Sequence, residues 1–327
     1  MFAELSLFPE QASTGAPAVD GVFFGLLAIT GFTALAIAVL IVYFAIRYRA
    51  RGQQTPRILG SIKLETWWTV IPLLIFLGMF AWGAQVYFYQ TQVPADAMEI
   101  YVVGKQWMWK VQHRGGQREI NELHVPVNTP IKLTLTSEDV IHDFFVPAFR
   151  TKMDVLPGRY TQLWFQATKP GKYDIHCAQY CGTDHSGMIG EVVVMEQADY
   201  TAWRNSHAEG SLALEGRKLF LKLQCVSCHS ADARARAPVL EDLYGRTVYL
   251  RGGGTVVANA DYIRESILKP QAKIVEGWEP IMPTFQGQVN EEEMIQLIEY
   301  VKSLRAGQTP VRTEDAAPPI VTPPPPR

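Results

Sequence analysis

The sequence predicts a multi-domain chain with an N-terminal two-helix transmembrane hairpin, an all-β middle domain and an all-α C-terminal domain. Three observations predict it: two long uncharged apolar runs, a central series of short strand-like runs separated by glycine and proline, and helical patterns towards the end. The 327 residues are enough for two soluble domains beside a membrane hairpin. A net charge of −2 gives no bulk electrostatic attraction to nucleic acid, so no nucleic-acid partner is expected.

The two apolar runs, residues 22–46 and 67–89, each exceed the ~20 residues that a helix needs to cross a bilayer. Tryptophan and tyrosine stand at the two ends of the second run, as in the aromatic belts of membrane helices. Pro72 falls in the first turns of that run, where proline is tolerated. Residues 1–21 contain no Lys or Arg, which argues against a signal peptide. The alternative, a pair of buried core helices, does not account for this length.

The segment between the two apolar runs is strongly basic. It carries a single acid, Glu65, against five cations: Arg47, Arg49, Arg51, Arg57 and Lys63. The positive-inside rule therefore places this loop in the cytoplasm. Both termini and the soluble domains are then expected on the periplasmic or outer side of a bacterial inner (cell) membrane.

The middle of the chain alternates short apolar runs with turn signals such as Gly-Gly and Pro-Gly. The runs at residues 99–103, 131–136, 160–166 and 190–195 are expected to be strands of a sandwich or barrel. Between two late strands lies the dodecapeptide 177–188, Cys-Ala-Gln-Tyr-Cys-Gly-Thr-Asp-His-Ser-Gly-Met. It is expected to connect two strand ends, which would place its side chains at one end of the domain.

The dodecapeptide brings two thiols, an imidazole and a thioether together in the pattern C-x3-C-x3-H-x2-M. Thiolate, thioether and imidazole ligands select copper over harder metals, and two cysteines this close could bridge two copper ions. His142, just after the 131–136 strand, is the candidate ligand from elsewhere in the chain. The remaining histidines outside the haem motif described below have no such neighbours and are expected to be structural or exposed: His113, His124, His176 and His207.

At this point the chain resembles subunit II of the haem–copper cytochrome c oxidases over roughly residues 20–200. The resemblance rests on the Cys–His–Met loop, on Ser-Glu-Asp-Val-Ile-His at 137–142, on Gln-Trp-Met-Trp at 106–109 and on Asp-Val-Leu-Pro-Gly-Arg at 154–159. It implies a cupredoxin-like barrel with a dinuclear copper A centre of two copper ions. The ligands it implies are His142, Cys177, Cys181, His185, Met188 and the backbone carbonyl of Gln179.

Three further positions follow from the same resemblance. Trp107 matches the tryptophan through which the family accepts electrons, and Glu65 matches the carboxylate at the entrance of a proton-uptake channel. Core packing and an interfacial charge facing water are the ordinary alternatives for these two. Gln179 departs from the family, which commonly has Glu at the middle of the loop. Because a neutral amide is a weaker ligand for a hard cation, the magnesium site at the interface with subunit I is doubtful here.

The C-terminal domain carries a haem attachment motif. Residues 225–229, Cys-Val-Ser-Cys-His, match the C-x-x-C-H pattern, in which Cys225 and Cys228 hold one covalently bound haem c and His229 ligates its iron. A helix is expected to begin at Glu215 and to run into this motif, and a last helix is expected over residues 291–304. Such attachment takes place outside the cytoplasm.

The second axial ligand of the iron is expected from one of the two methionines that follow the motif. Met294 fits the apolar stripe of the last helix and is expected in the core. Met282 lies in the non-helical Ile-Met-Pro-Thr-Phe segment, which resembles the Met-Pro-x-Phe of class I cytochromes c and makes it the expected ligand. Met/His ligation raises the haem potential. The C-terminal domain as a whole resembles the class I cytochromes c, which are all-α.

These observations divide the chain into six segments. They are an N-terminal periplasmic segment 1–21, the transmembrane hairpin 22–91, the cupredoxin copper A domain 92–197, a linker 198–212, the cytochrome c domain 213–306 and a Pro-rich tail 307–327. The tail composition cannot form a packed core and predicts an extended or disordered segment.

The resemblance implies subunit II of a proton-pumping, caa-type cytochrome c oxidase. Electrons would pass from cytochrome c or another respiratory complex through haem c to copper A. From there they would reach subunit I, which holds an a-type haem and copper B and reduces O2 to water. Subunit III is a further expected partner. The two spans contain no histidine, so no oxygen site is expected in this chain.

Two other functions compete with this one. The chain could be a membrane-anchored copper and haem carrier that serves a nitric oxide or nitrous oxide reductase. It could also be a non-redox assembly or anchoring subunit, like quinol-oxidase relatives that have lost the copper ligands. The presence of all the copper donors, from His142 to Met188, argues against the second alternative.

Overall fold

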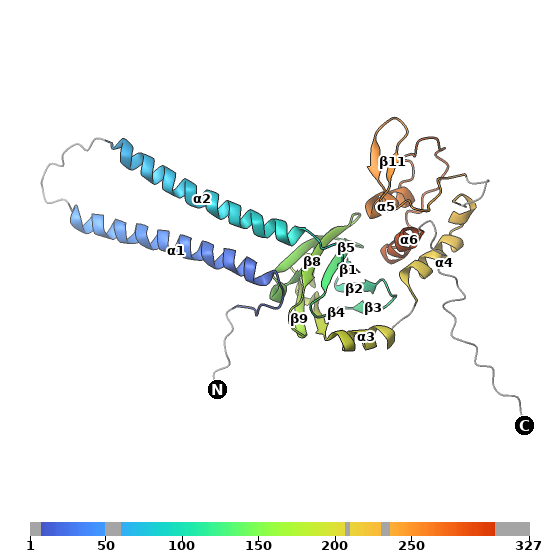
Figure 1. Cartoon of the computed structure of the whole chain (residues 1–327), viewed down its shortest axis with the longest axis horizontal. Coiled ribbons are helices and arrows are strands. Elements are labelled where there is room, and N and C mark those ends of the chain that lie inside the picture. Colours follow the sequence, from blue (N-terminus) through green and yellow to red (C-terminus); the bar gives the residue numbers. More distant parts are fainter. Residues whose placement is uncertain (1–7, 50–59, 207–209, 230–235, 305–327) are drawn as a thin grey trace, which may run out of the picture.

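A computed structural model describes residues 8–49, 60–206, 210–229 and 236–304. Two long helices extend from a β domain, and a mainly helical domain packs on another side of it (Figure 1). The multi-domain fold class is therefore confirmed. The Pro-rich tail at 307–327 and most of the basic loop at 50–59 lie outside the described residues, as do residues 1–7.

The first two helices are α1 (Ala16–Arg47) and α2 (Ile62–Thr91), which run side by side away from the β domain (Figure 1). Both are long and apolar enough to cross a membrane. The most apolar stretch of each helix has no residue buried within the structure. Both helices begin before the expected runs because Pro17 suits the start of α1, and the Ser61 hydroxyl accepts from Leu64 N at the start of α2. Pro72 consequently lies inside α2 and not in its first turns, which corrects the expectation.

The β domain consists of two five-stranded sheets with strand orders β3-β2-β1-β5-β8 and β4-β10-β9-β6-β7. Most neighbours are antiparallel, while β1–β5 and β4–β10 are parallel. The strands are β1 (Met98–Lys105), β2 (Met108–His113), β3 (Arg118–Ile120), β4 (Glu122–Pro126), β5 (Pro130–Ser137), β6 (His142–Val146), β7 (Thr151–Val155), β8 (Thr161–Gln166), β9 (Gly171–Cys177) and β10 (Ile189–Met195).

The inner faces of the two sheets form one apolar core. Side chains alternate along strands such as β9, where Tyr173, Ile175 and Cys177 are buried and the residues between them are exposed. Trp109 and Phe144 meet edge to face at 5.1 Å between ring centroids, and both are fully buried. The core therefore extends up to the end of the domain where β6 begins and β9 ends.

The helix hairpin is attached to the β domain by a buried ion pair. Arg150 donates from Nε to Asp20 Oδ1 at 2.8 Å and from Nη2 to Asp20 Oδ2 at 3.0 Å. Gln11 also donates to Asp20, and the Arg150 guanidinium donates to the carbonyl oxygen of Pro9. Because Asp20 lies on α1, these contacts fix the first turns of the hairpin against the β domain.

The segment expected to be a linker is a helix over most of its length, α3 (Gln197–Ser206). Its aromatic residues pack on the β domain: the Trp203 ring stacks on His124 at 4.7 Å, and Tyr200 is buried. His113 and His124 both hydrogen-bond the Glu119 carboxylate beneath this helix. The i, i+3 spacing of Tyr200 and Trp203 is the feature of the sequence that could have predicted this helix. His207 lies outside the described residues.

The C-terminal domain contains α4 (Leu212–Lys222), α5 (Ala260–Leu268) and α6 (Glu291–Ser303), with a short hairpin of β11 (Thr247–Tyr249) and β12 (Thr255–Val257). α4 begins before Glu215 because the Ser211 hydroxyl accepts from Leu214 N. A capping box between Asn290 and Glu293 starts α6. Met294 is buried in the core, as expected.

Candidate metal centre and cofactor cavity

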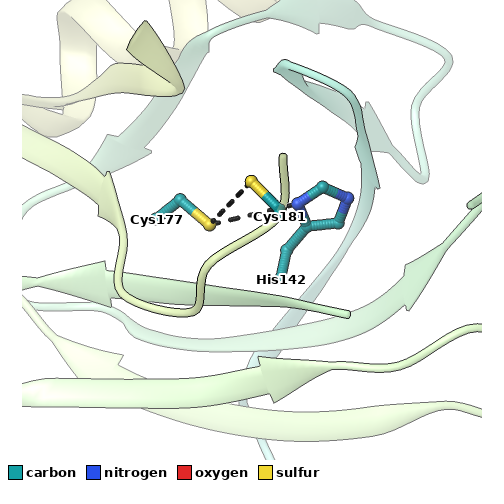
Figure 2. A group of neighbouring side chains, drawn as sticks. All are labelled: His142, Cys177 and Cys181. Carbon is teal, nitrogen blue, oxygen red and sulfur yellow. Dashed lines mark hydrogen bonds between the residues drawn. The ribbon is translucent and has the colours of Figure 1, made fainter. Parts of the chain in front are cut away.

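The start of β6 and the end of β9 bring His142, Cys177 and Cys181 together at one end of the β domain (Figure 2). Antiparallel pairing of the two strands sets Phe144 opposite Cys177, which brings His142 to the same end. His142 Nδ1 lies 3.9 Å from Cys177 Sγ, and the two sulfur atoms are 3.7 Å apart. This separation far exceeds an S–S bond of about 2.05 Å, so both cysteines are free to act as ligands.

The rest of the expected donors lie on the loop after β9. A 3-10 turn over His185–Gly187 folds the chain back, so that His185 Nδ1 is 3.4 Å and Met188 Sδ 3.9 Å from Cys181 Sγ. The carbonyl oxygen of Gln179 lies 3.2 Å from Cys177 Sγ. The structure therefore brings together all six donors that the sequence suggested.

Asp139, which is not among the expected site residues, orients the His142 ring. His142 Nε2 lies 2.9 Å from Asp139 Oδ1, so the Nε2–H group donates to the carboxylate and the Nδ1 lone pair faces Cys177. The Asp139 carboxylate also accepts from the backbone N–H groups of Gln106 and Val140. A carboxylate three residues before a candidate ligand was the sequence signal that could have identified it.

The two thiols differ in acidity because they are buried side by side. Burial opposes the Cys177 thiolate, but hydrogen bonds to His142 and to the backbone outweigh this and lower the pKa of Cys177. Burial and the neighbouring Cys177 raise the pKa of Cys181. A metal ion that binds both sulfurs as thiolates therefore has to displace the proton that Cys181 holds more strongly.

The donor set fits a copper centre. His142 and Met188 are fully buried and both sulfurs are nearly so, while His185 is partly exposed. The Trp109 ring packs edge-on against His142 at 6.0 Å and excludes water from that side. Two thiols, two imidazoles and a thioether in such a dry site are the soft and borderline ligands that copper prefers.

The two other expected functional positions lie in different places. Trp107 is half-buried between β1 and β2 and packs beside the 177–188 loop. A Cβ added to Gly182 of that loop would lie only 3.2 Å from the Trp107 ring. Glu65 lies in the first turn of α2, and this helix begins at the end of the hairpin distant from the β domain (Figure 1). The structure thus brings Trp107 to the donor cluster and keeps Glu65 far from it.

The C-terminal domain encloses an apolar cavity of about 350 Å³ that Cys225, Cys228, His229 and Met282 all line. The 3-10 turn Cys225–Ser227 directs the two cysteines to it. His229 Nδ1–H donates to the carbonyl oxygen of Pro238 at 2.9 Å, which leaves Nε2 as the free ligand atom. Two thiols, an imidazole and a thioether at one apolar cavity fit a covalently held haem.

Comparison with known proteins supports both halves of this arrangement. The family model of the cytochrome c oxidase subunit II periplasmic domain matches residues 79–196, and that of cytochrome c matches residues 213–305. The alternative cytochrome c oxidase subunit 2 of Bradyrhizobium diazoefficiens is 33% identical over 207 residues, which span 54% of this chain and 75% of the relative.

A second relative extends this likeness over most of the chain. Cytochrome c oxidase subunit 2 of Alkalihalophilus pseudofirmus is 29% identical over 302 residues, or 86% of each protein. The crystal structure of the periplasmic domain of subunit II of cytochrome oxidase from Bradyrhizobium japonicum is 33% identical with a TM-score of 0.34. This match covers 36% of the present chain and 96% of that one.

Proposed function

Because this chain belongs to the cytochrome c oxidase subunit II family and carries a C-terminal cytochrome c domain, we propose that it transfers electrons from an external donor to the oxygen-reducing subunit I. The observation that carries this proposal is the convergence of six copper-type donors on one buried end of the β domain. One-electron transfer is the chemistry that a two-copper centre and a haem supply when they are bound.

The residues that would hold two copper ions are His142, Cys177, Cys181, His185 and Met188, together with the Gln179 carbonyl. Asp139 holds the His142 ring in the tautomer whose Nδ1 faces the sulfur atoms. Burial keeps water from the thiols, and the fixed donors limit the rearrangement that a change of metal charge would require.

The residues that would hold haem c are Cys225 and Cys228, which would attach it covalently, and His229 and Met282, which would ligate its iron. The Pro238 carbonyl fixes the His229 ring through its Nδ1–H group. The apolar lining of the cavity would favour the less charged state of a bound haem and would thereby raise its potential.

The membrane arrangement forms part of the same proposal. α1 and α2 would cross the cell membrane, with Arg47, Arg49 and Lys63 at the cytoplasmic end and both soluble domains on the outer side. We place the segment boundaries at 21, 91, 197, 212 and 306. In this orientation Glu65 stands at the cytoplasmic entrance of a proton path and Trp107 at the electron entry beside copper.

Subunits I and III, and a cytochrome c or another respiratory complex as donor, are the partners that this function requires. Subunit I would contribute an a-type haem and copper B and would pump protons. The Gln179 side chain is exposed and neutral, so it offers little support for an interfacial magnesium ion.

Purification of the full chain from its host membrane tests this function against the competing carrier hypothesis. The expected result is co-purification with an a-type haem and with oxygen consumption driven by reduced cytochrome c. The copper resonance should show an unpaired electron shared equally by two copper nuclei. A complex without haem a or oxygen consumption, or one that reduces nitric oxide or nitrous oxide, would contradict the oxidase function.

Two variants, one in each candidate site, sharpen this test at the level of the chain. Cys181→Ser should abolish the two-copper signal and leave the haem c spectrum intact. Replacement of Met282 by alanine should remove the Met–haem absorption band and leave the two-copper signal intact. A single-copper signal in the unmodified chain would exclude the dinuclear centre.

A further inference from the structure

We infer that five polar groups between the two soluble domains, four of them largely buried, are positioning residues, which hold the haem-binding domain in one orientation for electron transfer to the copper site. This inference rests on the proposed function. We call these five groups the interdomain ion cluster: Glu99, Tyr101, Arg114, Glu299 and Lys302. The first three belong to the β domain and the last two to α6.

The contacts within the interdomain ion cluster are short and connect every member. Glu299 accepts from the Tyr101 hydroxyl at 2.5 Å through Oε1 and from Arg114 Nε at 2.8 Å through Oε2. Lys302 Nζ donates to the Tyr101 oxygen at 2.6 Å and lies 2.8 Å from Glu299 and 3.3 Å from Glu99. Each contact joins the two domains except the Lys302–Glu299 pair within α6.

The burial of these groups makes the orientation specific. The side chains of Glu299 and Lys302 are only 3% and 10% exposed. Two carboxylates face two cations, and Lys132 adds a further contact to Glu99. Burial opposes the charged form of Glu99, but Lys302 and Lys132 outweigh it and lower its pKa to about 2. Rotation of the domain would separate Glu299 from Tyr101 and Arg114, and Lys302 from Glu99, and would leave these largely buried groups with fewer partners, which is unfavourable.

The cluster and the haem cavity lie on opposite sides of α6. Leu297 and Val301 line the cavity, whereas Glu299 and Lys302 face the β domain. Because two residues advance a helix by about 200°, positions 299 and 301 point in nearly opposite directions. Figure 1 likewise shows α6 between the β domain and α4. α6 therefore lies between this wall of the cavity and the copper domain, and the cluster sets the rotation of that helix.

Two contacts at the other end of the interface support the same orientation. Lys110 Nζ bonds Glu292 of α6 at 2.8 Å and Glu138 at 2.9 Å, next to the Asp139 that orients His142. Arg264 of α5 donates to the Gly158 carbonyl at 2.9 Å. The haem-binding domain is thus tied to the copper domain near both ends of α6.

The test uses the full chain with copper and haem bound and the double variant Glu299→Gln/Lys302→Met, which removes both charges with little change of shape. Amide hydrogen exchange of residues 98–105 and 291–303 is measured by mass spectrometry, beside the haem and copper spectra. Photochemical reduction of the haem gives the rate of internal electron transfer. The expected result is exchange about tenfold faster or more in both segments. The rate of electron transfer from the haem to copper should change at least severalfold, while the haem and copper spectra stay unchanged.

Three further variants make the outcome decisive. Tyr101→Phe removes one hydroxyl only and should give a smaller change in the same direction, even if the double variant folds poorly. Lys302→Arg should preserve the unmodified transfer rate. The matched control is Glu191→Gln, which breaks the exposed Lys172–Glu191 pair of the β domain and should change neither quantity.

Two results separate the inference from the function on which it rests. Unchanged exchange and unchanged internal transfer in the double variant would overturn the positioning role. Absence of the two-copper signal or of internal transfer in the unmodified chain would instead overturn the proposed function.

Discussion

Asp139 determines which nitrogen of His142 faces the two cysteine sulfurs, because its carboxylate accepts the Nε2–H group at 2.9 Å. Such outer partners change metal affinity by roughly 10- to 100-fold when they are removed. Single residues of this kind act on the metal without touching it. They are therefore found from the structure more readily than from ligand spacing.

Asp139→Asn should lower the affinity for copper by about tenfold while the chain remains folded, because the neutral amide holds the His142 ring less strongly. Copper affinity is measured by competition with a chelator of known strength. Asp174→Asn, at an exposed position of β9, is the control and should leave the affinity unchanged. Equal affinities for the two variants would refute the orienting role of Asp139.

Gln179 contributes its backbone carbonyl to the donor cluster, while its side chain is exposed. Gln179→Ala should therefore leave copper affinity within about twofold and keep the two-copper resonance unchanged, since the carbonyl remains in place. The resonance and the chelator competition are recorded on the same sample. Loss of the two-copper signal in this variant would show that the side chain takes part.

At the scale of elements, the hairpin depends on the buried pair between Asp20 of α1 and Arg150 of the β domain. Asp20→Asn leaves the guanidinium buried without a counter-charge and should lower the free energy of unfolding of the β domain by about 3 kcal/mol. Denaturant titration in detergent, followed by tryptophan fluorescence, measures this change.

The control for that variant is Glu215→Gln. It breaks the exposed Lys218–Glu215 pair and should cost less than about 0.5 kcal/mol. A loss of similar size in the two variants would mean that the Asp20–Arg150 pair has no special part in attaching the hairpin.

The helices α1, α2 and α6 could be predicted from composition and periodicity, as could the start of α6 at Glu291, but the first residues of α1 and α2 could not. The capping groups Ser61 and Ser211 start α2 and α4 before the apolar pattern becomes visible. α3 was interpreted as a linker because its mean composition is polar. Its two aromatic residues are stabilised by packing on the β domain, which a local pattern does not reveal.

For the molecule as a whole, the interdomain ion cluster makes the docking of the two soluble domains sensitive to acid. The pKa of Glu99 is depressed from 4.5 to about 2 in the folded chain. Part of this depression comes from Lys302 of α6, so ionisation of Glu99 stabilises the docked state above pH 4.5, and this stabilisation is lost as the pH falls towards 2.

Glu99→Gln should consequently weaken docking at pH 6, whereas the difference between the unmodified chain and the variant should be smaller at pH 3 and should vanish only towards pH 2. Amide exchange of residues 291–303, corrected for its intrinsic pH dependence, measures the docking equilibrium at each pH. A difference between the two proteins that stays constant from pH 6 to pH 3 would contradict the assignment.

The sequence by itself determined the two apolar spans, the haem motif at 225–229 and the candidate copper donors of the 177–188 loop, because each depends on composition or on spacing within a short segment. It also indicated His142 as the distant ligand, from its place just after the 131–136 run and from the ligand chemistry of the loop. Tertiary structure alone decided how His142 meets Cys177 across β6 and β9, and that Asp139 orients it. It also decided the orientation of the haem-binding domain, since the Tyr101–Glu299 contact joins residues 198 positions apart. No local pattern encodes such a contact, which forms only when two folded surfaces bury their charges together.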